Sequence, residues 1–352
     1  MTTPRLDLPV RPPIDPMLAK RVDDIPRGDG WLFEPKWDGF RAIVFFDGER
    51  IYLQSRDKKP FDRYFPELAH DLPARIGRPL VLDGEIVIAG ELGLDFDALQ
   101  QRIHPAASRV ARLAEETPAT FVAFDLLATG DEALLATPFG DRRARLEAAL
   151  ADAGGPLRLT PATPDTLVAA DWFERFEGAG FDGLIAKRLD GPYEPGVRSM
   201  FKIKHMRTVD CVVAGLRWAK DEAGTAVGSL LLGLYDRDGT LHYVGHTSSF
   251  RAPERRALVE RLSPLITEDE GEGFGGGRTP GGESRWSRGK DTSWVRLRPG
   301  LVCEVTFDQL QSARFRHGST FVRWRHDKPP AACDFDQLEI APPAELAALF
   351  GG

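Results

Sequence analysis

The sequence predicts an α+β protein in which a domain of mixed strands and helices is followed by a small β-barrel. Up to about residue 204, β-rich runs alternate with helical runs, whereas after residue 207 successive strands surround one clear helix. The 352 residues, 42% of them hydrophobic, are enough for one large domain or two medium ones. We therefore expect domains at 1–205 and 206–352, with a hinge near 204–208.

The first domain begins with closely spaced strands. Trp31 to Lys36 and Phe40 to Phe46 are separated by the bend Asp38-Gly39, and the alternation continues across Asp47-Gly48 as a hairpin. The further expected strands are 50–55, 81–88 interrupted by Asp83-Gly84, 120–127, 181–187 and 200–204. The expected helices are one capped by Asp141, running to about 152 and ended by Gly154, and one at 167–177.

The second domain is rich in strands. A helix is expected at 253–262, and strands are expected at 209–218, 229–235, 241–245, 301–309 and 320–325. About five strands and one helix in a domain of this size favour a small barrel, with the OB-fold as the leading candidate. The Gly- and Glu-rich segment 268–289 is expected to be a long loop.

Composition limits the class of protein. No apolar run is long enough to span a membrane, and the N-terminus lacks the apolar core of a signal peptide. Cys211, Cys303 and Cys333 are far apart, which indicates a reducing cytoplasm, no zinc site, and buried apolar roles. The net charge of -7 argues against a general polyanion binder. Basic residues nevertheless gather in 198–207, 285–298 and 314–328. These segments form either one basic face that binds phosphate or three separate solvated surfaces.

The run from Glu34 to Arg41 is the most informative one for function. Lys36 ends an expected strand, beside the bend, where its side chain would point into a cleft. A lysine nucleophile must be held rigidly and partly shielded from water, with phosphate-neutralising groups nearby. The alternative is an ordinary surface lysine beside a turn.

Further runs place acids, bases and an aromatic side chain at strand ends. They are Ser55-Arg56, Leu82-Asp83-Gly84-Glu85, Phe121 to Asp125, Asp182 to Lys187, Phe201 to Lys204 and Phe321 to Lys328. Together with Lys36-Trp37-Asp38-Gly39, and in this order, they resemble the nucleotidyltransferase superfamily, above all the short bacterial ATP-dependent DNA ligases of the ligase C group. The resemblance implies a nucleotidyltransferase (adenylation) domain of antiparallel sheets with flanking helices, followed by an OB-fold barrel.

The resemblance also implies roles at the nucleotide. Lys36 would become adenylylated, and its amine must be neutral to attack, a form that nearby cations and partial burial favour. Glu34 would recognise adenine, and Phe124 would stack on it. Lys202 and Lys204, which strand alternation puts on one face, would bind the α-phosphate. Lys187 would be a neighbouring phosphate contact or a structural contact.

Further roles concern the metal, the leaving group and the polynucleotide. Glu85 would bind the ribose or Mg²⁺, and Asp182 would be a metal ligand although the family commonly has Glu there. Arg323 and Arg325 would orient pyrophosphate. Arg41 and Arg56 would contact the bound ATP or AMP as well as the DNA. The DNA-contact candidates are Arg41, Arg56, Arg285, Arg288 and Lys290.

The implied reaction is the sealing of nicks with a 5′-phosphate and a 3′-hydroxyl in duplex DNA. ATP and Mg²⁺ would be required, with Mn²⁺ able to substitute, and lysyl-AMP and adenylylated DNA would be intermediates. We expect a monomer in the nucleoid-associated cytoplasm, with no membrane contact, acting in DNA repair with or without other repair proteins.

Two alternatives remain open from the sequence. A capping-type guanylyltransferase or an RNA ligase would use the same lysine chemistry, and nucleotide preference with an RNA-versus-DNA nick assay would separate them. A non-catalytic DNA-binding module with a degenerate ligase fold would form no covalent adduct.

Overall fold

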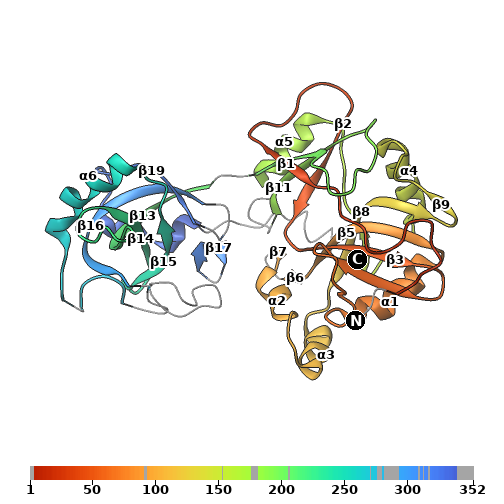
Figure 1. The fold of residues 1–352 in the computed structure, drawn as a ribbon, viewed down its shortest axis with the longest axis horizontal. Coiled ribbons are helices and arrows are strands. Elements are labelled where there is room, and N and C mark those ends of the chain that lie inside the picture. Colours follow the sequence, from red (N-terminus) through yellow and green to blue (C-terminus); the bar gives the residue numbers. More distant parts are fainter. Residues whose placement is uncertain are drawn as a thin grey trace. The chain divides into compact units, whose positions relative to one another are not determined.

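The chain forms two compact units, one from the described residues up to 204 and one from those between 207 and 338 (Figure 1). The computed structural model describes residues 4–90, 93–152, 154–175, 181–204, 207–269, 271–275, 280, 293–307, 310–311, 313–315 and 318–338. Part of the predicted hinge (205–206) and the end of the predicted second domain (339–352) lie outside these ranges.

The first unit contains two main sheets. The four-stranded sheet has the order β1-β12-β11-β2, which is Ala19–Val22, Met200–Ile203, Phe181–Arg188 and Trp31–Trp37. The second has the order β10-β8-β5-β3-β4, which is Leu157–Leu159, Thr120–Thr129, Leu80–Val87, Phe40–Phe46 and Ile51–Ser55, with β9 (Glu132–Ala133) beside β8. Pairing is antiparallel except for β1 with β12 and β10 with β8. The two short strands β6 (Ala89–Gly90) and β7 (Gly93–Leu94) form a separate pair.

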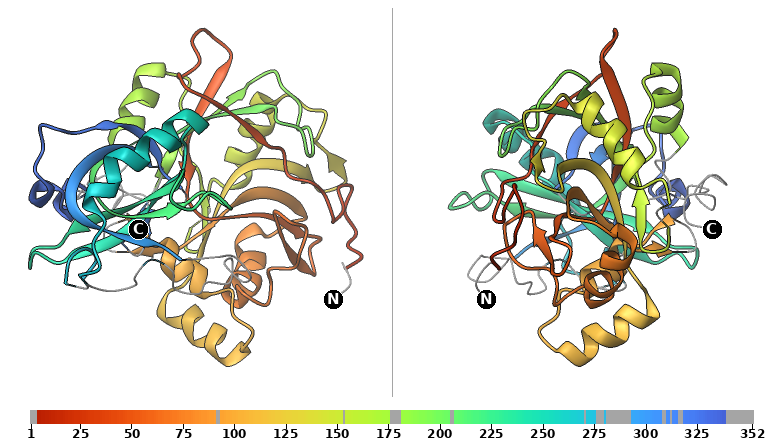
Figure 2. Two further views of the ribbon diagram at one scale, coloured as in Figure 1. Left: turned by 60° about the vertical axis from the view of Figure 1, so that its left-hand side comes forward. Right: turned by 90° about the vertical axis from the view of Figure 1, so that its right-hand side faces the viewer.

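The described part of this unit contains five α-helices (Figures 1 and 2). They are α1 (Pro66–Ile76), α2 (Phe96–Gln101), α3 (Ala107–Glu116), α4 (Phe139–Ala149) and α5 (Thr166–Arg175). Helix α4 packs on β8, and α5 packs on β2 and β11. The sequence predicted α4 and α5 and missed the other three, together with β1 and β10.

Two predicted features of this unit are wrong. Asp83-Gly84 does not interrupt its strand, because β5 is continuous and only its register with β8 shifts there. A Cβ on Gly84 would lie 2.4 Å from the Phe121 ring, so glycine allows close packing rather than a turn. Helix α4 begins at Phe139, with Pro138 as N-cap, and ends at Ala149, so Asp141 lies in its first turn.

The hydrophobic side chains of the first unit pack among themselves. The apolar cluster between the second sheet and α1 includes Leu53, Leu68, Leu82 and Phe121, all fully buried. Every other apolar cluster of this unit is likewise built from residues before 204. Each unit therefore has its own hydrophobic core.

A buried ion pair joins α4 to β8. Arg142 donates two hydrogen bonds to Asp125, at 2.8 and 3.0 Å, and both side chains are almost completely buried. We expect Arg142→Met to lower the free energy of unfolding by about 3–5 kcal/mol, because it leaves a buried carboxylate without its partner. Urea-induced unfolding measures the loss.

A matched control lies on the same helix. Arg145 pairs with Glu132 at 2.8 Å, but the side chains are 43% and 58% exposed. Arg145→Ala should lower the free energy of unfolding by less than about 1 kcal/mol. An equal loss of unfolding free energy in the two variants would show that the buried pair stabilises the fold no more than the exposed pair does.

The second unit is a five-stranded antiparallel sheet with one α-helix among its described residues. The order β15-β14-β13-β16-β19 is Leu241–Thr247, Val227–Tyr235, Arg207–Trp218, Val295–Phe307 and Thr320–Trp324. A bridge between Thr247 and Ser319 joins the ends of the two edge strands, as expected of a partly closed OB-fold barrel. Helix α6 (Ala252–Leu262) packs on β14, and the short strands β17 (Leu310–Gln311) and β18 (Arg314–Phe315) pair with each other.

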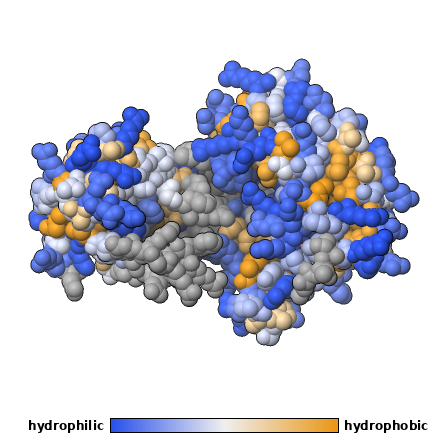
Figure 3. Space-filling view, in the orientation of Figure 1, coloured by the Kyte–Doolittle hydropathy of each residue, from blue (hydrophilic) through white to orange (hydrophobic). Residues whose placement is uncertain are grey.

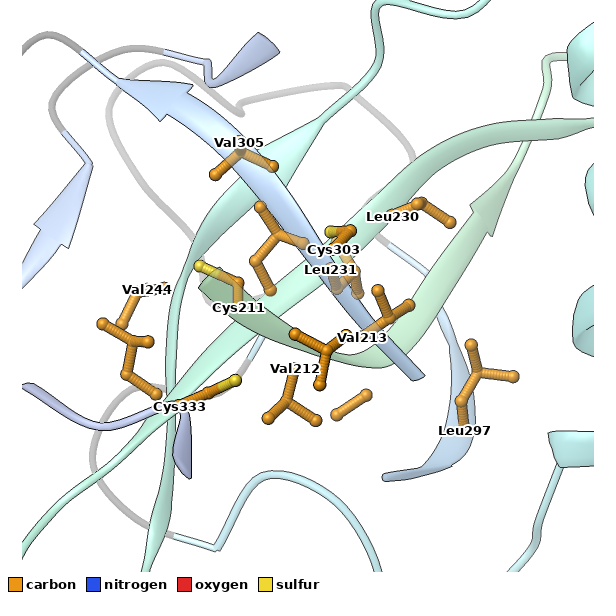
Figure 4. Packing of buried hydrophobic residues seen from close by; sticks show 14 of the residues in the cluster. Cys211, Val212, Val213, Leu230, Leu231, Val244, Leu297, Cys303, Val305 and Cys333 are labelled. Atoms are coloured by element: carbon orange, nitrogen blue, oxygen red, sulfur yellow. The ribbon is translucent and has the colours of Figure 1, made fainter. Parts of the chain in front are cut away.

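The three cysteines lie together in the core of the second unit (Figure 4). Cys211 on β13 is the register partner of Cys303 on β16, and Cys333 packs in the same cluster. All three are free thiols, and burial raises the pKa of each, which keeps them protonated. They are buried apolar side chains, as predicted.

The exterior contrasts with these cores. In the view of Figure 3, hydrophilic residues dominate the described surface, and apolar residues occur in smaller groups between them. None of the helices in the described ranges is long and apolar enough to cross a membrane.

Candidate active site

A pocket in the first unit gathers residues from both main sheets. Its volume is about 220 Å³. Seven of the predicted site residues line it: Glu34, Lys36, Arg41, Arg56, Glu85, Phe124 and Lys202. They come from β2, β3, the end of β4, β5, β8 and β12, so segments far apart in the sequence meet at one place. The pocket lining also includes Lys187, together with Arg198 and the segment 16–19, of which the sequence did not assign the last two to the site.

Lys36 is held at the pocket by a carboxylate. The Nζ atom of Lys36 lies 2.7 Å from Oδ2 of Asp182, and the Nζ atom of Lys204 lies at the same distance from that oxygen. Burial alone would raise the pKa of Asp182, but Lys36 and Lys204 outweigh it and lower that pKa. Asp182 is therefore a carboxylate shared by Lys36 and Lys204, and its role as a metal ligand stays a prediction.

The backbone at Asp182 explains this contact. The register between β11 and β2 shifts between Phe181 and Leu184, as in a β-bulge. Gly183 has a φ of +110°, and a Cβ there would lie 1.9 Å from the carbonyl oxygen of Ile203. Glycine thus allows the bulge that directs Asp182 to the lysines.

Lys202 adds a third ammonium group near this carboxylate. Burial, Lys204 and Lys36 all lower the pKa of Lys202. The clustering of cations favours an anion between them, as predicted for Lys202 and Lys204.

Arg41 is fixed by a hydrogen-bond network. Its guanidinium donates to both carboxylate oxygens of Asp83, at 2.7 and 2.6 Å, and Asp83 also accepts a hydrogen bond of 2.7 Å from the Tyr193 hydroxyl. The same guanidinium lies 4.6 Å from the ring centroid of Phe124. Asp83 and Tyr193 were not predicted as site residues, although Asp83 stands two residues before Glu85 in the same motif.

Glu34 lines the pocket and is itself buried. Its Oε2 atom is 2.8 Å from Nζ of Lys187, and Lys187 also donates to the carbonyl oxygen of Phe124 at 3.0 Å. Lys187, open in the sequence between a phosphate contact and a structural role, is buried in this pairing. Arg143 on α4 completes the surroundings of Glu34, and no motif pointed to it.

Glu85 is the remaining acid of the pocket. Its register partner across β3 and β5 is Arg41. Burial raises the pKa of Glu85 to about 7, although Arg41 and Lys36 act to lower it. Among the described residues, no group of three or more His, Cys, Asp or Glu side chains forms a ready metal site.

The predicted residues of the second unit lie on β19 and just after it. Arg323 pairs with Glu304 at 2.5 Å and is 60% exposed. Arg325 pairs with Asp210 and Asp327, each at 2.8 Å, and Lys328 also binds Asp210 at 3.0 Å. Arg285, Arg288 and Lys290 lie outside the described residues.

Comparisons with known proteins identify the family of this chain. The family model for the ATP dependent DNA ligase domain matches residues 16–204, and that for the ATP dependent DNA ligase C terminal region matches residues 223–328. The chain is 52% identical to DNA ligase C2 of Mycolicibacterium smegmatis over 347 residues, covering 96% of this chain and 97% of that protein. It is 51% identical to DNA ligase C of Mycobacterium tuberculosis over 346 residues, covering 95% and 96%.

A solved structure supports the fold. A Lig E DNA ligase matches with a TM-score of 0.53 and 18% identity over 88% of this chain and 99% of that one. At this identity the likeness concerns the fold alone. The family models and the near full-length identity go further: the chain belongs to the ATP-dependent DNA ligases, in their short bacterial group.

Proposed function

We propose that the chain seals nicks in duplex DNA with Lys36 as the nucleophile. The observation that carries this proposal is the position of Lys36 in a pocket lined by six other residues predicted for nucleotide binding. Phosphoryl transfer depends mainly on positioning and charge neutralisation, and this pocket offers both. A nicked duplex with a 5′-phosphate, compared with the same nick in RNA, tests the substrate.

The first transfer forms lysyl-AMP. Lys36 loses a proton to solvent, its Nζ atom forms a bond to the α-phosphorus of ATP, and the bond from that phosphorus to pyrophosphate breaks. Lys202 and Lys204 neutralise the α-phosphate. Because an incoming phosphate competes with Asp182 for the lysines, ATP binding releases the amine of Lys36 from its carboxylate partner.

The next two transfers consume the adduct. An oxygen of the 5′-phosphate attacks the AMP phosphorus, and the bond to Nζ of Lys36 breaks as the amine regains a proton. The 3′-hydroxyl then attacks the 5′-phosphate, so that AMP leaves and the strand is joined. Arg41, held by Asp83, and Arg56 are the proposed contacts to the DNA end.

Magnesium would neutralise phosphate charge in these steps. Mg²⁺ is commonly bound by one or two carboxylates with substrate phosphates and water, and Glu85 fits this pattern because it lines the pocket, where Arg41 and Lys36 favour its carboxylate form. Asp182 fits less well, because one of its oxygens already accepts two lysines. We propose Glu85 as the ligand, with Mn²⁺ able to substitute.

Glu85→Gln should raise the Mg²⁺ concentration needed for half-maximal adduct formation by at least about tenfold, because the amide retains the shape of the side chain but loses its charge. Mg²⁺ titration at saturating ATP measures this, with thermal unfolding as the control for folding. If Asp182→Asn raised the requirement more than Glu85→Gln, Asp182 would be the metal ligand instead.

The remaining proposals concern the setting of the reaction. We propose that Arg285, Arg288 and Lys290 add phosphate contacts to the DNA, so that binding weakens as salt rises. The enzyme would act as a monomer at the nucleoid in DNA repair, with or without other repair proteins. The short bacterial relatives support the choice of DNA over RNA or a capped end.

A further inference from the structure

Glu34 has one oxygen with a partner and one without. Oε2 is bound by Lys187 at 2.8 Å. Oε1 is buried, the whole residue is 2% exposed, and this oxygen has no hydrogen-bond partner among the described residues. Because Glu34 lines the nucleotide pocket, a buried acceptor without a partner there suits a donor on the ligand.

The guanidinium of Arg143 lies near this oxygen. Its Nη1 atom lies 3.6 Å from Oε1, too far for a hydrogen bond, and is itself buried with no partner among the described residues. The rest of its guanidinium is anchored, since Nε donates to Glu147 at 2.7 Å and Nη2 donates to the carbonyl oxygen of Thr160 at 2.9 Å. The Thr160 hydroxyl accepts a hydrogen bond of 2.8 Å from Trp37, the residue after Lys36.

We infer that Arg143 is a positioning residue that makes Glu34 select a purine with an amino group at position 6. The inference rests on the proposed function, in which this pocket binds ATP. Lys187 occupies one oxygen of Glu34, and Arg143 attracts the other without occupying it, so Oε1 is left as an acceptor for the amino group. A 6-oxo purine such as inosine presents an acceptor at that point, and two acceptors facing each other in a buried site are disfavoured.

The charge of Glu34 is central to this selection. Burial raises the pKa of Glu34, while Lys187 and Arg143 act in the opposite direction. Without Arg143, one of the two cations that oppose burial is lost, and the protonated acid gains population. A protonated Oε1 is a donor, which suits a 6-oxo group instead of an amino group.

The decisive comparison is between ATP and ITP as substrates for self-nucleotidylation. Arg143→Gln should lower kcat/KM for ATP by about 10- to 100-fold and leave kcat/KM for ITP unchanged or raised. The ratio of kcat/KM for ATP to kcat/KM for ITP should therefore fall at least about tenfold. An equal loss with both nucleotides would overturn the inference, because a merely structural defect would not distinguish them.

Two further variants keep the test sound if Arg143→Gln is unstable. Arg143→Lys retains the charge without the forked geometry and should lower the ratio by less. Glu34→Gln should lower the ratio by itself, and adding Arg143→Gln to it should cause no further fall, because both act through one oxygen. Additive losses of selectivity in the double variant would contradict the mechanism.

Arg145→Gln, on the exposed side of the same helix, is the matched control and should leave the ratio unchanged. The wild-type protein separates the two hypotheses. If it forms no covalent adduct with ATP, the proposed function fails. If it forms the adduct and Arg143→Gln leaves the ratio unchanged, only the role of Arg143 fails.

Discussion

Lys36→Ala should abolish self-adenylylation. The amine of Lys36 is the proposed nucleophile, and loss of a nucleophile removes the covalent route altogether, so the rate should fall by at least about 1000-fold. Intact mass after incubation with Mg²⁺ and ATP measures the effect. The wild type should gain the mass of one AMP, and the variant should gain none.

Lys36→Arg is the matched control for folding and charge. Its guanidinium retains a positive charge beside Asp182, which lies 2.7 Å from Lys36, but it does not serve as the nucleophile. The variant should remain as stable as the wild type and still form no adduct. A full AMP adduct on either variant would place the nucleophile elsewhere.

Removal of residues 205–352 should leave a folded fragment that reacts with ATP at least about 100-fold more slowly. Among the described residues, the apolar clusters of the first unit contain none beyond 204, so the fragment retains these clusters. It loses Arg323 and Arg325, the proposed partners of the departing pyrophosphate, whose positive charge would stabilise the transition state. Labelled ATP measures the rate.

Pre-adenylylated nicked DNA is the control substrate. Joining of this DNA needs no pyrophosphate to leave, so the fragment should still seal it weakly. In the full chain, Arg325→Ala should reproduce most of the loss with ATP, and it tests the residue without removing a domain. Labelling of the fragment at the wild-type rate would show that Arg323 and Arg325 are not needed.

The sequence pointed to residues that line the pocket better than to the residues that hold them in place. Lys36, Glu85 and Lys202 stand in short runs at strand ends, and such runs can be read locally. Tyr193 and Arg143 meet the site from distant segments, 110 residues from Asp83 in the first case. The packing of the two sheets and α4 brings these two side chains to the site. The residues next to them in the sequence therefore gave no indication of a role there.

The boundaries of helices also depend on contacts with segments that are distant in the sequence. The start of α4 is shifted from Asp141 because the backbone amides of Phe139 and Gly140 donate to the carbonyl oxygens of Gly191 and Leu189. These distant partners satisfy the free amides of the first turn, a role that a local cap usually fills. The three buried cysteines, widely spaced in the sequence, share one core because of such distant contacts. Pairing of β13 with β16 brings Cys211 beside Cys303, and Cys333 packs in the same cluster.

A single-turnover assay tests the central claim most directly. The protein is charged with ATP, freed of nucleotide and Mg²⁺, and then mixed with Mg²⁺ and a nicked DNA duplex carrying a 5′-phosphate and a 3′-hydroxyl. We expect the mass of one AMP to disappear from Lys36 as one strand is joined per charged molecule, while the corresponding RNA nick reacts more slowly. Charged protein that retains its AMP in the presence of the nick, with no joined strand, would contradict the account.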